Sequence, residues 1–373
     1  MVAVNPIPQN VRRIRTSRGL RQDEVARKAG ISRNAFRSIE TGQAEPRVST
    51  LQGIARALGV DLPALLAEPP RLASMRFRSS KAKTRKAQAT RDQVIVEVAR
   101  WLRDFAGLEE LLDQRKPYAL QALGSELSDS TDPNRPVEAA RLARQALGLK
   151  PDEPIRDICG LLESAGVKVH VTKVEMENLF GLSVAAADGG PAVVVNVRDD
   201  ISVERRIFTA AHELGHLLLH PRAYDVEQLE EDRDEEKEAD LFASHFLMPS
   251  EAFQSEWRDT NGLPLVDRVL HVKRIFRVSY QTVLVRLVES RQVDPAKVWM
   301  IFKAQWKRRS AQALTKKVEP MPLAEVDFLE DRLSRLVRKA VESEKITLSR
   351  AAEILGLNLS TMREVVASWQ VAP

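Results

Sequence analysis

The stretch FTAAHELGHLLLHP, residues 208–221, constrains this chain most, because it places three of the six histidines in an otherwise nearly apolar helical segment. An α-helix turns once every 3.6 residues, so His212 and His216 lie on one face, one turn apart. Burying them beside Glu213 without a partner would cost several kcal/mol. A bound cation removes that cost, and zinc accepts imidazole nitrogen at about 2.0–2.1 Å. The spacing therefore predicts a metal site.

The residue next to the first histidine predicts the chemistry of that site. A zinc ion held by three protein groups keeps a water as its fourth ligand, and Glu213 can take a proton from that water. Zinc is the expected metal, with manganese and iron as alternatives, because affinity order and availability both select the ion. The competing interpretation is an amphipathic helix whose histidines only face solvent.

A second helix, within residues 230–249, is expected to supply the third ligand. Its apolar stripe leaves Glu236 and Asp240 together on an adjoining face. We predict that Glu236 binds the metal and that Asp240 accepts a hydrogen bond from a ligand histidine. Glu235 and Glu238 are expected to point away into solvent.

Two further side chains near the motif stay open. His220 follows His216 by another turn but has drifted around the axis, so we expect it at the helix end or behind a ligand rather than on the metal. Tyr224 could polarise a substrate carbonyl, although a structural role is the more frequent one.

Residues 10–68 predict a separate domain of about five short helices, punctuated by glycines. RQDEVARKAG supplies one helix, Gly30 and Ile31 a turn, and SRNAFRSIETG a second helix whose polar positions face outward. Arginine reads guanine and asparagine reads adenine in the major groove, whereas an amide at the preceding helix start fixes a phosphate. The residues expected to contact DNA are Gln22, Ser32, Arg33, Asn34, Arg37 and Ser38. Backbone contacts are expected from Arg12, Arg13, Arg15, Arg18, Arg47 and the basic run 76–91.

These residues carry two family resemblances. Residues 11–67 resemble helix-turn-helix domains of the XRE type, and VVVNVRDDISVERRIFTAAHELGHLLLH with EKEADLFASHFLMPS is similar to the ImmA/IrrE zinc metallopeptidases. In the latter family the two motif histidines and a glutamate thirteen residues before the proline of LMP bind the metal. Counting back from Pro249 gives Glu236. The resemblance implies peptide hydrolysis, with helix-turn-helix repressors of stress or mobile-element switches as the substrate class.

The overall expectation is a mainly helical α+β chain. We predict a five-helix helix-turn-helix domain over 1–70, a basic linker and helical connector over 71–150, a zincin-like metallopeptidase domain with a small sheet over 151–302, and a helical C-terminal domain over 303–373. That last domain is either a second helix-turn-helix or a protein-contact and dimer-packing element. Strands are expected after Gly166, within LFGLSVAAA and within PAVVVNVRD. The last of these is expected to be a sheet edge that pairs with an extended substrate.

Length and composition predict the number of domains, the class of partner and the cellular compartment. A length of 373 residues predicts two or three domains, and a net charge of +5 permits contact with nucleic acid. A single cysteine, Cys159, and no membrane-length apolar run or signal-type N-terminus predict a reduced, cytoplasmic protein without membrane contact.

Together these features predict a transcriptional regulator that binds double-stranded operator DNA as a homodimer and cleaves a partner regulator, or itself, with a zinc endopeptidase domain. The alternative is a transcription factor or antitoxin without proteolysis, in which the peptidase fold serves as a sensing or dimerisation module.

Overall fold

The computed structural model describes residues 6–18, 20–66, 72, 74–77, 85–127, 132–224, 232–290, 294–311, 314 and 318–369. The chain forms two compact units, one of residues 1–71 and 91–99 and the other of residues 72–90 and 100–373. The fold is mainly helical with one small sheet, as the sequence predicts.

The first unit contains the five short helices expected at the N-terminus. They are α1 (Ile7–Ser17), α2 (Gln22–Ala29), α3 (Arg33–Glu40), α4 (Val48–Leu58) and α5 (Leu62–Leu66). Gly30 ends α2 in the left-handed conformation, with φ 72°, which glycine adopts without strain. Ser32 then caps α3 by accepting a hydrogen bond from the Ala35 amide at 3.1 Å. The two helices therefore meet at a tight turn around a core that includes the fully buried Phe36.

The second unit is built around a four-stranded sheet in the order β1-β3-β4-β2. The strands are β1 (Met75–Phe77), β2 (Lys168–Thr172), β3 (Gly181–Val184) and β4 (Ala192–Asn196). β4 runs parallel to β2 and antiparallel to β3, and β3 pairs antiparallel with β1.

Two expectations about strands are wrong. β4, predicted as a substrate-binding edge, is an inner strand because β2 and β3 pair with its two sides. All five of its residues are buried, as expected for a strand covered on both faces. Residues 75–77, predicted as linker, form the edge strand β1 instead.

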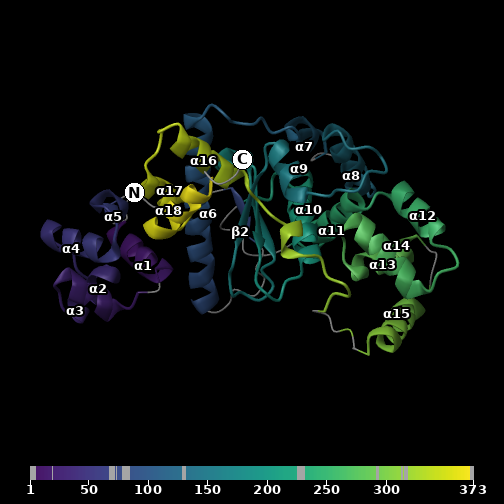
Figure 1. Cartoon of the computed structure of the whole chain (residues 1–373), viewed down its shortest axis with the longest axis horizontal. Coiled ribbons are helices and arrows are strands. Elements are labelled where there is room, and N and C mark those ends of the chain that lie inside the picture. Colours follow the sequence, from purple (N-terminus) through teal and green to yellow (C-terminus); the bar gives the residue numbers. More distant parts are fainter. Residues whose placement is uncertain are drawn as a thin grey trace. The chain divides into compact units, whose positions relative to one another are not determined.

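Further helices follow the first five along the chain, and Figure 1 shows some of them beside this sheet and others farther from it. They are α6 (Arg85–Leu111), which extends through both units, α7 (Gln121–Leu127), α8 (Arg135–Ala146), α9 (Ile158–Ser164), α10 (Val203–Leu219), α11 (Arg233–Leu247), α12 (Ser250–Asp259), α13 (Leu265–Phe276), α14 (Tyr280–Glu289), α15 (Pro295–Ser310), α16 (Arg332–Glu342), α17 (Leu348–Ile354) and α18 (Leu359–Trp369). Short 3₁₀ turns occupy Ala186–Asp188 and Glu325–Asp327. α10 is central, because it packs on β3 and β4 and against α11.

Two glycines allow α10 to approach its neighbours closely. A Cβ atom at Gly215 would lie 2.9 Å from the Phe242 ring of α11. A Cβ atom at Gly181 of β3 would lie 2.5 Å from the Thr209 side chain of α10. Real Cβ contacts are longer, so the lack of a side chain at these positions lets α11 and β3 come close to the same helix.

Buried ion pairs attach the C-terminal helices to the second unit. The Glu109 carboxylate on α6 pairs with Arg332 of α16 at 2.5 Å and with Lys168 of β2 at 3.2 Å. Beyond α16, Gly356 lies between α17 and α18, and these two helices contact each other. This arrangement leaves both interpretations of the C-terminal region open as predictions.

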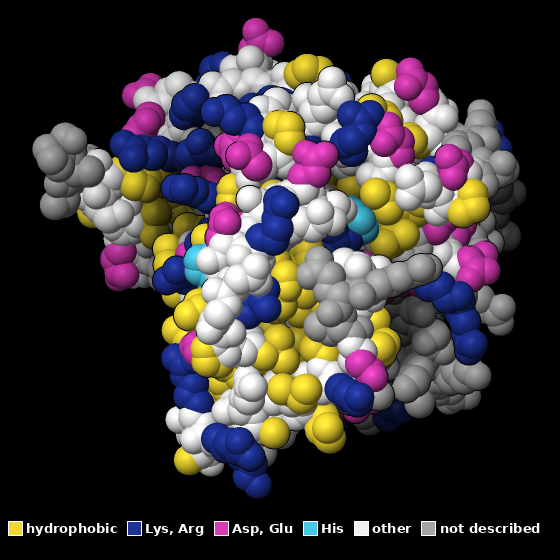
Figure 2. Space-filling view, turned by 90° about the vertical axis from the view of Figure 1, so that its right-hand side faces the viewer, with side chains coloured by type: hydrophobic (Ala, Val, Ile, Leu, Met, Phe, Trp, Pro, Cys, Tyr) yellow, Lys and Arg dark blue, Asp and Glu magenta, His cyan; other side chains and the backbone are white. Residues whose placement is uncertain are grey.

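Apolar side chains also reach the surface of the second unit. Figure 2 shows them gathered in the lower half of one face. α15, the lowest labelled helix in Figure 1, exposes Met300 and Ile301. No helix within the described residues is long and apolar enough to cross a membrane.

The buried Glu163 of α9 makes stability depend on pH. Burial, with a smaller contribution from Asp331, raises its pKa to about 8. Its protonated form is favoured in the folded state, so its contribution to stability is complete below about pH 4.5 and is lost as pH rises through about 8. We expect Glu163→Gln to flatten this loss, which is at most about 1.4 kcal/mol per pH unit. Urea unfolding between pH 5 and 8 measures the free energy of unfolding at each pH, and Glu126→Gln at an exposed position is the control. The same pH dependence of this free energy in wild type and Glu163→Gln would contradict the role of Glu163.

Candidate functional site

Three side chains from α10 and α11 converge on one point. The Nε2 atoms of His212 and His216 lie 3.0 Å apart. The Glu236 carboxylate places Oε1 3.3 Å from His216 Nε2 and Oε2 3.8 Å from His212 Nε2. Ligands that surround a zinc ion tetrahedrally at about 2.0–2.2 Å lie about 3.3 Å from one another. The three donors therefore fit a single divalent ion, and the structure brings together the three residues that the sequence selects.

Hydrogen bonds hold both imidazoles with Nε2 toward this point. His212 Nδ1 lies 2.7 Å from Asp240 Oδ1. His216 Nδ1 lies 2.9 Å from His220 Nδ1, and His220 Nε2 lies 2.8 Å from Glu238 Oε2. Such partners fix the tautomer and the ring orientation of metal-binding histidines. Asp240 thus lies where the sequence places it, and His220 lies at the end of α10 behind His216 rather than among the three donors.

Glu213 lies on the side of α10 that faces β3. Its Oε2 accepts a hydrogen bond from Ser183 Oγ at 2.7 Å, and Ser183 Oγ accepts one from Tyr224 Oη at 2.9 Å. Its other oxygen, Oε1, is buried and has no hydrogen-bond partner among the described residues. A buried carboxylate oxygen without a partner is costly unless a water or substrate group reaches it. Glu213 therefore offers an acceptor oxygen within the same helix that carries two of the three donors.

Sequence reasoning missed Ser183 altogether. Ser183 is fully buried in the middle of a short strand, where its hydroxyl needs hydrogen-bond partners. Burial raises the pKa of Tyr224 well above its usual value, so the phenol stays protonated and donates a hydrogen bond to Ser183 Oγ. The only signal in the sequence is a polar residue inside the apolar strand LFGLSV, and that signal alone names no partner.

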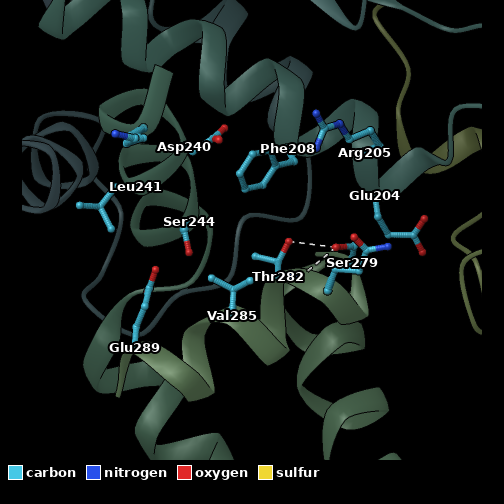
Figure 3. Close-up of a pocket in the computed structure, with 12 residues that line it drawn as sticks. Glu204, Arg205, Phe208, Asp240, Leu241, Ser244, Ser279, Thr282, Val285 and Glu289 are labelled. Carbon is cyan, nitrogen blue, oxygen red and sulfur yellow. Dashed lines mark hydrogen bonds between the residues drawn. The ribbon is translucent and has the colours of Figure 1, made fainter. Parts of the chain in front are cut away.

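A cavity of about 440 Å³ adjoins the site on the side of His212. Figure 3 shows Phe208 of α10 and Asp240 of α11 above it and side chains of α14 below. Leu241 and Val285 give it apolar walls, and Glu289 adds a charge. Phe208 precedes His212 by one helical turn, and Asp240 contacts His212 at Nδ1, so the cavity reaches the His212 ring from the side opposite its Nε2.

Two carboxylates expected to be solvated are instead paired, which corrects that prediction. Glu235 forms an ion pair with Arg76 of β1, with 2.5 Å between Glu235 Oε2 and Arg76 Nη1. Glu238 pairs with Arg135 of α8 as well as with His220. The sequence of α11 alone does not predict these contacts, because the arginines that pair with Glu235 and Glu238 lie on β1 and α8, in distant parts of the chain.

The helix-turn-helix unit presents part of its predicted DNA-contacting set outward. Arg33, Asn34 and Arg37 on α3 are exposed, whereas Ser38 is half-buried and Ser32 serves as the cap of α3. Gln22 is half-buried and donates a hydrogen bond to Glu40.

Two arginines expected at the DNA backbone have contacts inside this unit. Arg15 pairs with Glu40 at 2.6 Å and donates to the Leu20 carbonyl at 2.8 Å. Arg18 donates to the carbonyls of Leu58 and Gly59. Arg12 and Arg47 are exposed. The side chains of Arg13 and of residues 78–89 in the basic run lie outside the described residues.

Comparisons with known proteins match the two parts of the chain separately. The family model of the IrrE N-terminal-like domain, peptidase M78, matches residues 162–288, and a helix-turn-helix model matches residues 11–65. An immunity repressor protein of Bacillus phage phi105 is 37% identical over 62 residues, which are 17% of this chain and 43% of the repressor. An uncharacterized HTH-type transcriptional regulator of Sinorhizobium fredii is 41% identical over 54 residues, 14% of this chain and 70% of the regulator. The chain thus spans less than half the length of the phage repressor.

Two solved structures align along most of the chain but with low similarity. PlcR of Bacillus thuringiensis, solved with a peptide and DNA, is 12% identical with a TM-score of 0.16, and the alignment covers 97% of this chain and 99% of PlcR. ComR of Streptococcus suis is 13% identical with a TM-score of 0.16, covering 99% of this chain and 96% of ComR. At these scores neither match bears on the fold or the site.

The hydrogen bond from His212 to Asp240 gives a test of the proposed metal centre. We expect Asp240→Ala to weaken the binding of a divalent ion by about 10–100-fold, because the imidazole loses the partner that orients it. Competition with a chromophoric chelator measures this affinity. Asp234→Ala removes an exposed carboxylate from the same helix and is the matched control. Equal affinities of the two variants would show that Asp240 does not orient His212.

Proposed function

The chain belongs to the helix-turn-helix transcriptional regulators and carries an IrrE N-terminal-like domain of the M78 peptidases. From this premise we propose that the chain is a zinc-dependent endopeptidase that cleaves a partner regulator. In this proposal His212, His216 and Glu236 bind the metal, Glu213 is the catalytic base and Asp240 orients His212. Manganese and iron are the alternatives to zinc at this set of donors.

The observation that carries this proposal is the convergence of His212, His216 and Glu236 on one point, on the same helix as Glu213, whose buried Oε1 has no hydrogen-bond partner among the described residues. A divalent ion bound there would polarise the scissile carbonyl and lower the pKa of a water. Glu213 would accept the proton of the attacking water through Oε1 and deliver it to the leaving amine. The hydrogen bond from Ser183 to Oε2 holds the carboxylate in place for both transfers.

The cavity beside Asp240 is large enough to hold a side chain of a peptide substrate. A side chain of a bound peptide fits a pocket of about 440 Å³ with apolar walls of Leu241 and Val285. Ser279 and Thr282, joined by a 3.0 Å hydrogen bond, line the same cavity from α14. This pocket would select one residue of the substrate next to the cleaved bond.

The helix-turn-helix unit would direct the protein to an operator. We propose that Arg33, Asn34 and Arg37 contact base edges from α3, that Ser32 and Ser38 contact the DNA at the ends of that helix, and that Gln22 contacts a phosphate. One such unit reads a short half-site, so a homodimer on a palindrome is the proposed binding form. The domain division at 70, 150 and 302 and a cytoplasmic location belong to the same proposal.

A second candidate function is regulation without proteolysis, with the peptidase fold as a sensing module. The ion pair between Arg76 and the proposed ligand Glu236, at 3.2 Å, favours it, because this contact engages a metal-binding oxygen. Stoichiometric zinc together with cleavage of a co-expressed regulator supports the peptidase. DNA binding by protein that takes up no zinc supports the sensor.

The role of Glu213 is tested by Glu213→Gln. The amide keeps the shape of the side chain but cannot accept the proton of a water, so we expect zinc binding to persist and cleavage of a co-expressed candidate regulator to stop. Metal analysis and product mass spectrometry measure the two properties. Glu251→Gln on the exposed face of α12 is the control. Cleavage at the wild-type rate by Glu213→Gln would remove this residue from the mechanism.

The DNA-reading role of α3 is tested by Arg33→Ala. A bidentate contact from arginine to guanine discriminates against other bases by about 1–3 kcal/mol, so the variant should lose preference at one base pair of its site. Selection from a random DNA library, followed by titration, measures the change. Arg56→Ala removes the same charge from an exposed position on α4. An identical sequence preference in wild type and Arg33→Ala would exclude Arg33 from base reading.

A further inference from the structure

Strand β1 occupies the edge of the sheet next to the candidate metal centre. Met75, Arg76 and Phe77 pair antiparallel with Val184, Ser183 and Leu182 of β3. Ser74 extends the pairing, because its carbonyl accepts the Ala185 amide at 2.9 Å and its amide donates to Asp188 Oδ2 at 2.6 Å. Without β1, the outer edge of β3 would present unpaired backbone groups.

The register places Arg76 over the site. Residues directly opposite each other in an antiparallel pair project to the same face of the sheet, so Arg76 shares a face with Ser183. Ser183 bonds the proposed catalytic base, Glu213, at 2.7 Å. β1 therefore runs beside the reacting groups in the extended conformation that a peptide adopts when it adds to a sheet edge.

The Arg76 guanidinium contacts a proposed metal ligand directly. Its Nη2 lies 3.2 Å from Glu236 Oε1, and its Nη1 lies 2.5 Å from Glu235 Oε2. Glu236 Oε1 is the same oxygen that lies 3.3 Å from His216 Nε2. Arg76 is only 8% exposed, so this contact is not a solvent-screened surface pair. Two positive groups therefore compete for the negative charge of Glu236. One is a metal ion bound by the histidines, and the other is the Arg76 guanidinium.

We propose that residues 74–77 are an internal occupant of a peptide-docking edge on β3, and that Arg76 competes with the metal for Glu236. The inference rests on the proposed function, because it assigns an inhibited state to that same site. An extended substrate replaces β1 on β3, and metal loading transfers Glu236 from Arg76 to the ion. Glu235 then faces the position that Arg76 leaves, so the substrate class is an extended segment with an arginine or lysine at that position.

Arg76→Met tests the competition, because it keeps the buried stem of the side chain and removes its charge. The apparent metal affinity is the intrinsic affinity multiplied by the fraction of molecules in the competent state. We therefore expect zinc to bind Arg76→Met about tenfold more tightly than wild type in chelator competition on the full chain. Lys237→Ala removes a positive charge next to Glu236 on the exposed side of α11 and should change the affinity much less.

Hydrogen exchange gives a second measurement that needs neither substitution nor catalysis. Backbone amides of residues 74–77 that pair in the sheet exchange slowly until that pairing opens. Adding zinc to the wild-type chain should increase amide exchange in this segment. Exchange in β2 should not change, because β2 pairs with β4 at the opposite edge of the sheet. Because this measurement uses only the wild-type chain, it tests the proposal even if Arg76→Met fails to fold.

The outcomes separate this inference from the proposed function. Tighter zinc binding by Arg76→Met, or faster exchange of residues 74–77 with zinc, supports the internal occupant. Unchanged affinity together with unchanged exchange overturns the internal occupant and leaves the metal centre standing. Failure of both wild type and Arg76→Met to bind zinc overturns the metal centre and this inference with it.

Discussion

The arrangement of the second unit depends on the burial of ionisable groups on α10. His212, Glu213 and His216 are at most 3% exposed, within a helix whose other residues are almost all buried. Groups of this kind cannot stay without partners in an apolar core. The partners come from every side: α11 provides Asp240, Glu236 and Glu238, and β3 provides Ser183. The same contacts between α10 and α11 therefore both satisfy the buried groups of α10 and form the proposed metal site.

The close approach of those partners depends on small residues rather than on the polar ones. Gly215 brings the backbone of α11 near α10, and Gly181 brings β3 near Thr209 and Glu213. A methyl group at either position would have to displace a ring or a backbone atom. At Gly215 such a displacement would move α11, which carries Glu236, relative to the two histidines of α10, and metal-ligand distances tolerate only a few tenths of an ångström. The lack of a side chain at Gly215 therefore helps to set the distances among the three proposed ligands.

Sequence reasoning located what depends on local periodicity. The spacing of His212 and His216, and of Glu236 and Asp240, follows from 3.6 residues per turn, and each pair lies on one helix. It failed for contacts between distant segments: Arg76 reaches across 160 residues to Glu236, and Arg135 reaches across 103 to Glu238. The misplacement of β4 was avoidable, because an unbroken run of apolar residues is typical of an inner strand covered on both faces.

The ion pair between Arg76 and Glu236 is better explained by competition than by stability. Desolvation of a buried ion pair offsets most of its attraction, so such a pair is weak support for a fold on energetic grounds. Arg76 also keeps a buried Nε without a hydrogen-bond partner among the residues that the structure describes, and β1 is only three residues long. The segment buries Met75 fully, so a ligand that replaces it must fill the place of that side chain as well as pair with β3 and Glu235. A longer extended segment can do so, because β1 covers only three residues of β3.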